Sequence, residues 1–154
     1  MARTFRSTAS FGKRQEYVVI AELLRRGFDV YQTLVDDQGI DCIIRLDDQG
    51  GLRYIDLQIK ARSKDCDPNN AGRFTAIKIV NPRPNYYFIF YSEQADTYWV
   101  VPSLKLVSIA YQNKKGKNMG RYGINFCTLR ANGEVIPNPK FDEYRDNFNL
   151  LKQA

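Results

Sequence analysis

The chain of 154 residues contains no histidine. Without an imidazole, the protein has no Ser-His-Asp or Cys-His catalytic group, no histidine general base and no zinc site with histidine ligands. Any catalysis must therefore rest on carboxylates, lysine, tyrosine, or a metal ion that is held by oxygen atoms.

Cysteine is scarce and long apolar runs are missing. The three cysteines are odd in number and have no CxxC spacing, so the sequence indicates neither a disulfide framework nor a zinc site. The longest apolar stretches, residues 17–21 and 86–91, are far shorter than the roughly 20 residues that cross a bilayer, and no signal-like apolar segment begins the chain. We therefore expect a single domain over residues 1–154, located in the cytoplasm and without a membrane partner.

Acidic residues are outnumbered by basic ones. The sequence has 23 Lys and Arg residues against 17 Asp and Glu residues, for a formal net charge of +6 and an isoelectric point near 9.3. This balance suits a polyanionic partner, because Lys and Arg make the contacts to phosphate groups. Charge alone does not select that partner, since many basic proteins never touch nucleic acid.

The N-terminal part of the chain predicts an arm followed by a helix. Residues 1–10 are polar and contain two arginines, which is typical of a flexible basic arm. Ser10 can cap a helix over residues 11–26, which ends at Gly27 with basic residues in its last turn. The expected apolar stripe consists of Tyr17, Ile20, Leu23 and Leu24. Glu16 falls within this stripe, where a carboxylate is out of place.

Strands are expected through the rest of the chain. Residues 28–34, 40–46 and 52–62 are β-rich and separated by turn-like residues, which predicts a three-strand meander. Further strands are expected over residues 74–80, 86–91 and 96–101, and a short helix over residues 103–111. The apolar residues Phe141, Tyr144, Phe148 and Leu151 recur at helical spacing, which predicts core packing.

Residues 112–121 predict a mobile basic loop. Its cations are Lys114, Lys115, Lys117 and Arg121. One interpretation is a solvated surface loop, because runs of charged residues usually lie on the solvated surface. The other is a loop that contacts phosphates, with Tyr111 and Tyr122 available for stacking on bases.

The strand over residues 52–62 presents a polar face. Alternate side chains of a strand share a face, so Asp56, Gln58 and Lys60 line up together while their neighbours pack into a core. An ordinary edge strand alternates in the same way. If this strand forms a hairpin with the preceding one, Asp41 lies across the sheet from Gln58 and Lys60. The helix that carries Glu16 would then cover this edge.

The order of these residues resembles that of the PD-(D/E)xK nuclease superfamily. The family pattern is a helix Glu, a strand Asp, and then an acidic residue, any residue and Lys on the following strand. Gly39-Ile40-Asp41 followed by Gln58-Ile59-Lys60 is similar to the branch of Mrr-type restriction enzymes and archaeal Holliday-junction resolvases, with Gln in the acidic position as in the Mrr-type proteins. The resemblance implies an α/β, restriction-endonuclease-like fold: a central mixed β-sheet with an N-terminal helix, a three-strand meander and flanking helices.

The resemblance also implies an endonuclease that depends on Mg²⁺ or Mn²⁺ and acts on double-stranded or branched DNA. Asp41 and the side-chain oxygen of Gln58 would hold the metal, the backbone carbonyl of Ile59 would add a ligand, and Glu16 would complete the site. Lys60 would orient the attacking water. The candidate nucleic-acid contacts are Lys13, Arg14, Lys114, Lys115, Lys117 and Arg121. Cutting both strands with one small domain would call for a homodimer.

Plainer interpretations of the same residues remain open. In these interpretations, Glu16 would pair with Lys13 on the helix surface, Asp41 would cap a turn, and Asp56 would be a solvated strand residue. Because Gln58 removes one negative charge from the site, a second hypothesis is a catalytically inactive module that binds nucleic acid or a protein partner. A third is a purely structural β-rich subunit.

Overall fold

A computed structural model describes residues 5–35 and 38–154, with side chains from Ser10 onward. A central sheet of five strands runs in the order β1-β2-β3-β5-β6. Its strands are β1 (Asp29–Gln32), β2 (Cys42–Asp48), β3 (Gly51–Arg62), β5 (Tyr86–Ser92) and β6 (Thr97–Pro102). The pairs β1-β2, β2-β3 and β5-β6 are antiparallel and β3-β5 is parallel, which confirms the expected meander and mixed sheet.

The connection from β3 to β5 passes through a second sheet. It contains the 3₁₀ helix η1 (Pro68–Asn70) and β4 (Arg73–Ile77), with no α-helix in this stretch. β4 pairs with β8 (Tyr122–Asn125), which also pairs with β7 (Tyr111–Gln112). A small ribbon of β9 (Cys127–Leu129) and β10 (Val135–Pro137) follows. The strand expected over residues 74–80 is therefore found as β4 of this second sheet, and it ends at Ile77, so that residues 78–80 lie outside it.

The N-terminal helix α1 (Phe5–Arg25) is longer than expected. It begins six residues before the predicted start, so residues 5–10 are helical and Ser10 is not its cap; the first four residues of the expected arm lie outside the described part of the chain. The predicted stripe was wrong in part, because Tyr17 and Leu24 are 52% and 55% exposed. Leu23 is fully buried, as predicted, and so is Val19, which the predicted stripe did not include; together they fix which side of the helix faces the sheet.

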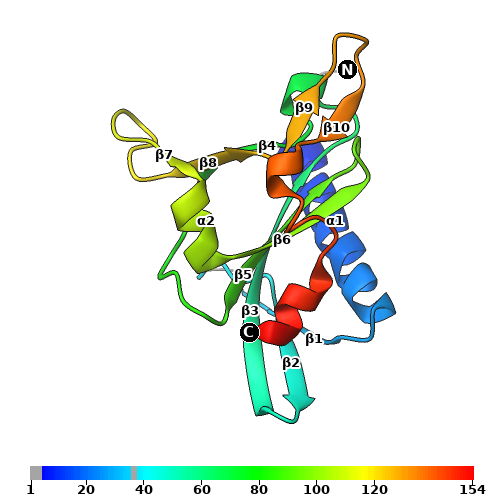
Figure 1. Cartoon of the computed structure of the whole chain (residues 1–154), viewed down its shortest axis with the longest axis vertical. Helices are drawn as coiled ribbons and strands as arrows, with labels where there is room; N and C mark the ends of the chain where they lie inside the picture. The colour runs from blue at the N-terminus through cyan, green and yellow to red at the C-terminus, as the bar shows by residue number, and fades with distance from the viewer. Residues whose placement is uncertain (1–4, 36–37) are drawn as a thin grey trace.

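Two apolar clusters cover the two faces of the central sheet. β5 contributes to both, because its alternate side chains point in opposite directions. Tyr87 and Ile89 join the cluster under α1, while Phe88 and Phe90 join the cluster under the second sheet. Figure 1 shows the same arrangement, with α1 on one side of the central sheet and the β4-β8-β7 sheet on the other. This confirms that residues 86–91 are buried on both faces.

The remaining helices are short. They are α2 (Ser103–Ile109) and the 3₁₀ helices η2 (Pro139–Phe141) and η3 (Phe148–Gln153). The four apolar residues of the C-terminal stripe are buried, as predicted, but they lie in or near two 3₁₀ segments and not on one continuous helix. Within the described chain, no helix combines the length and the apolar character that a membrane crossing needs.

Candidate functional site

Asp41 lies at the end of the β2-β3 hairpin. The last registered pair there is Cys42 with Leu57, so one further step places Asp41 directly opposite Gln58. The amide of Asp41 donates to the carbonyl of Leu57 at 2.8 Å, and its Oδ2 accepts from the amide of Ile59 at 2.7 Å. The residue is 6% exposed. Its carboxylate is therefore held by a charge-assisted bond to the neighbouring strand.

The chain entering Asp41 is also held from the other side. The hydroxyl of Thr33, just after β1, lies 2.9 Å from the carbonyl of Ile40 and 3.1 Å from that of Asp41. The amide of Thr33 donates to the Asp41 carbonyl at 3.4 Å. Asp41 is thus held between Thr33, which follows β1, and residues 57 and 59 of β3.

Gln58 is positioned by Tyr86, the first residue of β5. The buried Tyr86 hydroxyl lies 2.6 Å from the carbonyl of Gly39 and 3.2 Å from Oε1 of Gln58. Gly39 has a φ of +70°, and a Cβ there would lie 3.1 Å from the Tyr86 hydroxyl. Only glycine meets both demands, the left-handed backbone and the close approach. The tyrosine therefore ties Gln58 to the segment that leads into Asp41.

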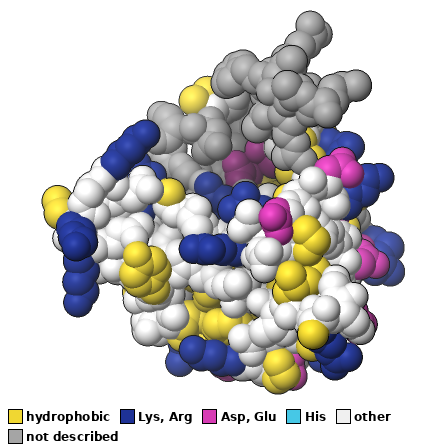
Figure 2. All heavy atoms as spheres, turned by 90° about the horizontal axis from the view of Figure 1, so that it is seen from above, with side chains coloured by type: hydrophobic (Ala, Val, Ile, Leu, Met, Phe, Trp, Pro, Cys, Tyr) yellow, Lys and Arg dark blue, Asp and Glu magenta, His cyan; other side chains and the backbone are white. Residues whose placement is uncertain are grey.

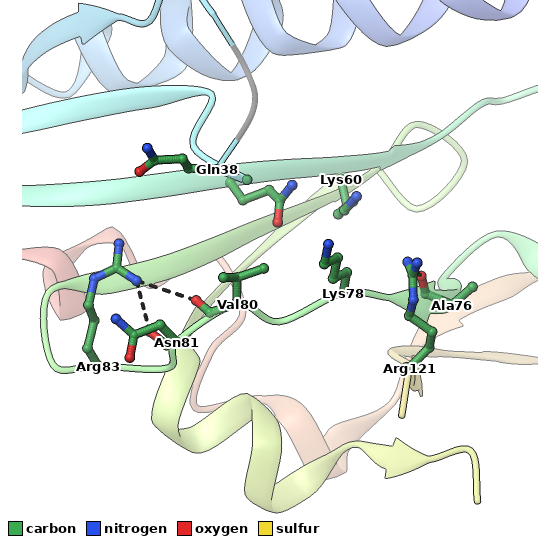
Figure 3. A pocket seen from close by; sticks show the side chains of 10 residues that line it. Gln38, Lys60, Ala76, Lys78, Val80, Asn81, Arg83 and Arg121 are labelled. Atoms are coloured by element: carbon green, nitrogen blue, oxygen red, sulfur yellow. Dashed lines mark hydrogen bonds between the residues drawn. The ribbon is translucent and has the colours of Figure 1, made fainter. Parts of the chain in front are cut away.

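Lys60 lies two residues further along β3, on the same face as Gln58, and is half-buried. A pocket of about 580 Å³ opens beside these two side chains. Its lining consists of Gln38, Gly39, Gln58, Lys60, Ala76, Lys78, Val80, Asn81, Arg83 and Arg121. Figure 3 shows that Lys60 and Lys78 point toward one another across it. Four cationic side chains and none of the described acidic ones line this pocket.

Arg83 forms the near wall of the pocket and is held by Asp56. The two side chains are 2.5 Å apart and only 26% and 18% exposed, and the guanidinium lies 4.5 Å from the centre of the Tyr86 ring. It also donates to the carbonyls of Val80 and Asn81 (Figure 3). The expectation of a solvated Asp56 was wrong, because the charge of Arg83 compensates it within the fold.

Glu16 reaches the same end of the sheet from α1. It forms the expected ion pair with Lys13 at 3.1 Å and is 23% exposed. Burial first, and then the charges of Asp41 and Glu16, together raise the pKa of the Cys42 thiol to about 12. The hydrogen bond and charge of Glu16 raise the pKa of Lys13, and Asp41 adds to this. The charges of both Glu16 and Asp41 thus act on the Cys42 thiol.

The predicted nucleic-acid contacts lie in three different places. Lys13 is paired with Glu16, and Arg14 is paired with Glu93 at 2.9 Å. Arg121 lines the pocket. The exposed lysines Lys114, Lys115 and Lys117 lie in the turn that joins β7 to β8, which projects from the molecule in Figure 1. Figure 2 shows Lys and Arg side chains spread across the face seen from above, with a few acidic side chains among them.

Three residues of the site were not predicted from the sequence: Lys78, Arg83 and Tyr86. For Lys78 a signal existed, because residues 74–80 were expected to form a strand, and Ala76, Lys78 and Val80 alternate onto the pocket. Arg83 stands between two prolines and Tyr86 in an apolar run, so neither carried a comparable signal.

The oxygen atoms at this end of the sheet suit Mg²⁺ or Mn²⁺ only in part. No group of three or more Asp, Glu, Cys or His side chains gathers for a metal anywhere in the described residues. The register places Gln58 opposite Asp41. The Ile59 carbonyl points to the same side of β3 as the Ile59 amide, which binds Asp41. Mg²⁺ accepts one or two carboxylates when waters and substrate phosphates complete its shell. The donor set fits an ion that substrate helps to hold.

No protein-family model matches the sequence, and no curated protein is similar to it. Among solved structures, a bacterial homing endonuclease, I-Ssp6803I, has a similar fold: the TM-score is 0.63 with 18% identity, over 96% of this chain and 95% of that one. A nuclease from a fusselovirus, D212, aligns over 99% of this chain and 93% of that one, with 12% identity. Its TM-score of 0.48 is too low to define a shared fold. The first likeness shows that this chain shares the overall fold of that endonuclease.

Proposed function

We propose that the protein is a divalent-metal-dependent DNA endonuclease, a Gln-x-Lys variant of the PD-(D/E)xK superfamily. One observation supports this most strongly: Asp41 lies opposite Gln58 at the end of a hairpin, with Lys60 on the same strand face as Gln58 and a cationic pocket beside both. The similarity of the fold to that of a homing endonuclease adds to the argument. Double-stranded or branched DNA is the proposed substrate.

Asp41 and the Gln58 amide oxygen would hold Mg²⁺ or Mn²⁺, with the Ile59 carbonyl and Glu16 at the edge of the site. A bound ion supplies a more acidic water and offsets charge on the phosphate. The amide in place of a carboxylate weakens this site, because two unit charges 4 Å apart interact by about 4 kcal/mol at an effective dielectric of 20. The phosphate of the substrate supplies the missing negative charge, so metal and DNA should bind cooperatively.

Lys60 orients the attacking water and stabilises negative charge that develops at the phosphate. An ammonium group suits this role because it is a compact charge with several donors. Its position two residues after Gln58 places it on the pocket side of the site, next to the cations that would hold the DNA backbone. A homodimer would provide the second site that is needed to cut both strands.

The test is nicking of supercoiled plasmid DNA in Mg²⁺ or Mn²⁺, with a chelator as blank. Asp41→Asn keeps an oxygen that can accept from Ile59 but removes the charge, so we expect a loss of at least about 10²-fold in rate. Asp47→Asn is the matched control, because Asp47 lies on β2, the strand that directly follows Asp41, and is 65% exposed. Nicking that survives both the chelator and Asp41→Asn would refute the proposal.

A second candidate is a non-catalytic module that binds nucleic acid. It is favoured by the small number of carboxylates among the described residues of the site and by the amide at Gln58. Under this alternative, the protein binds DNA with a strong dependence on salt but neither cuts it nor binds Mn²⁺ at Asp41.

A further inference from the structure

The pocket beside Lys60 gathers cations from both sheets. Lys60 comes from β3 of the central sheet, Lys78 follows β4, and Arg121 precedes β8. The guanidinium of Arg121 lies 3.5 Å from the carbonyl of Ala76, which directs it along the pocket wall. Segments far apart in the sequence therefore converge on one concave surface (Figure 3).

Of the four cationic side chains that line the pocket, only Arg83 is neutralised by a carboxylate within the described chain. Arg83 pairs with Asp56, as described above. The ion pairs among residues 10–35 and 38–154 include none with Lys60, Lys78 or Arg121. Like charges that face one another repel, and a bound anion converts that repulsion into attraction. The geometry therefore favours an anionic ligand between these side chains.

The other walls of the pocket match a phosphodiester better than a bare ion. Amide side chains of Gln38, Gln58 and Asn81 offer neutral hydrogen bonds, and Ala76 and Val80 provide small apolar surfaces on which a sugar can rest. The volume of about 580 Å³ is within the usual range for ligand pockets and exceeds what one phosphate needs. A stretch of nucleic-acid backbone fits both the chemistry and the size.

We infer that this pocket is a second phosphate site, in which Lys78 and Arg121 bind the strand that is cut, one step away from the phosphate that faces Lys60. The inference rests on the proposed function in so far as the ligand is DNA. Lys78 and Arg121 act as positioning residues: they hold the backbone so that the neighbouring phosphate lies between Lys60 and Asp41. The exposed lysines of the β7-β8 turn are not part of this site.

The experiment measures binding without cleavage. Asp41→Asn protein is titrated onto a fluorescent 20-base-pair duplex by anisotropy, without divalent ions, between 50 and 200 mM KCl. Each neutralised phosphate contact contributes about 0.9 to the slope of log affinity against log salt, so Lys78→Gln and Arg121→Gln should each lower the slope by about that amount. Lys78→Arg should restore it.

Lys152→Gln is the matched control, because it removes one charge from an exposed side chain. Lys152 packs on the ring of Phe28, which belongs to the cluster on the α1 side of the sheet. Its removal should leave the slope unchanged. Thermal unfolding of every variant checks the fold. If Lys78→Gln does not fold, the salt slope of Arg121→Gln alone tests the second phosphate site.

A cleavage measurement separates failure of this inference from failure of the proposed function. In protein that keeps the native Asp41, Lys78→Gln should raise the DNA concentration that gives half-maximal cleavage. Lys78→Arg should return that concentration to the original value. If the protein cuts DNA while Lys78→Gln and Arg121→Gln behave like Lys152→Gln in both assays, the second phosphate site is wrong and the nuclease stands. If the protein neither binds nor cuts DNA, both are wrong.

Discussion

The carboxylate side and the cationic side of the site are held in different ways. On the carboxylate side, Asp41 is bonded to the backbone of Ile59, eighteen positions along the chain and on the partner strand of one hairpin. On the cationic side, Arg121 contacts the backbone of Ala76 across 45 positions, and neither residue lies in the central sheet. A hairpin fixes the first side locally, whereas packing of one sheet on another assembles the second.

This difference assigns separate tasks to the two sides. On the carboxylate side, Asp41 is bonded to the backbone of Ile59, and the Tyr86 hydroxyl lies between Gly39 and Gln58, which fixes the positions that chemistry requires. On the cationic side, Lys60, Lys78 and Arg121 form no ion pair with a carboxylate among the described residues, as an anion site requires. Changes on the first side should alter the rate of cleavage, and changes on the second should alter affinity and its dependence on salt.

The largest effect within this comparison is expected at Lys60, where the two sides meet. Lys60→Gln should reduce cleavage by about 10²-fold, because it removes a charge that stabilises the transition state, and should lower the salt slope of binding by about 0.9. Lys60→Arg should restore the slope but not the rate, since a guanidinium differs from an ammonium in shape. Single-turnover cleavage and anisotropy measure the two quantities. An unchanged cleavage rate for Lys60→Gln would show that Lys60 contributes to DNA binding only and not to the chemical step.

A smaller effect is expected at Gly39. Gly39→Ala should cost about 1–2 kcal/mol of stability, because a Cβ strains its left-handed backbone, and it should slow cleavage several-fold by displacing Tyr86 from Gln58. Gly27→Ala is the control: its φ of +88° brings similar strain, but no atom lies within 4 Å of the added Cβ. Chemical denaturation and cleavage rates test both. If Gly39→Ala and Gly27→Ala slow cleavage equally, backbone strain accounts for the loss and displacement of Tyr86 does not.

The smallest effect is expected at Asp56. Asp56→Asn leaves Arg83 without its carboxylate, so stability should fall by about 1–2 kcal/mol while the pocket gains an uncompensated charge. DNA affinity should then rise a few-fold and its salt slope should become steeper. Anisotropy at two salt concentrations measures this change. An unchanged or weaker affinity would mean that Arg83 does not face the DNA.

The part of the site that could be predicted from the sequence is the part that local structure determines. Asp41, Gln58 and Lys60 follow from one hairpin, because the alternation of a strand and the register of its partner place them together. Glu16 was identified because it interrupts an apolar helix face. The helix began earlier than expected, and Tyr17 and Leu24 proved exposed, since packing against the sheet decides which side of a helix is buried.

The rest depended on contacts between distant segments. Lys78 and Arg121 meet only because β4 and β8 pair, and β8, β9 and β10 are only three or four residues long, too short for a clear periodic signal. The C-terminal stripe predicted burial correctly but not its geometry. Its two pairs, Phe141 with Tyr144 and Phe148 with Leu151, are each spaced by three residues, which suits the 3₁₀ turns that form there.

The central claim is that the end of the β2-β3 hairpin holds a divalent ion when DNA is bound. The most direct measurement is anomalous diffraction from crystals of the protein with a DNA duplex and Mn²⁺. The account predicts an anomalous peak between the Asp41 carboxylate and the Gln58 amide, with a phosphate oxygen beside it, and loss of that peak in Asp41→Asn. DNA seated in the pocket with no Mn²⁺ between Asp41 and Gln58 would contradict the account.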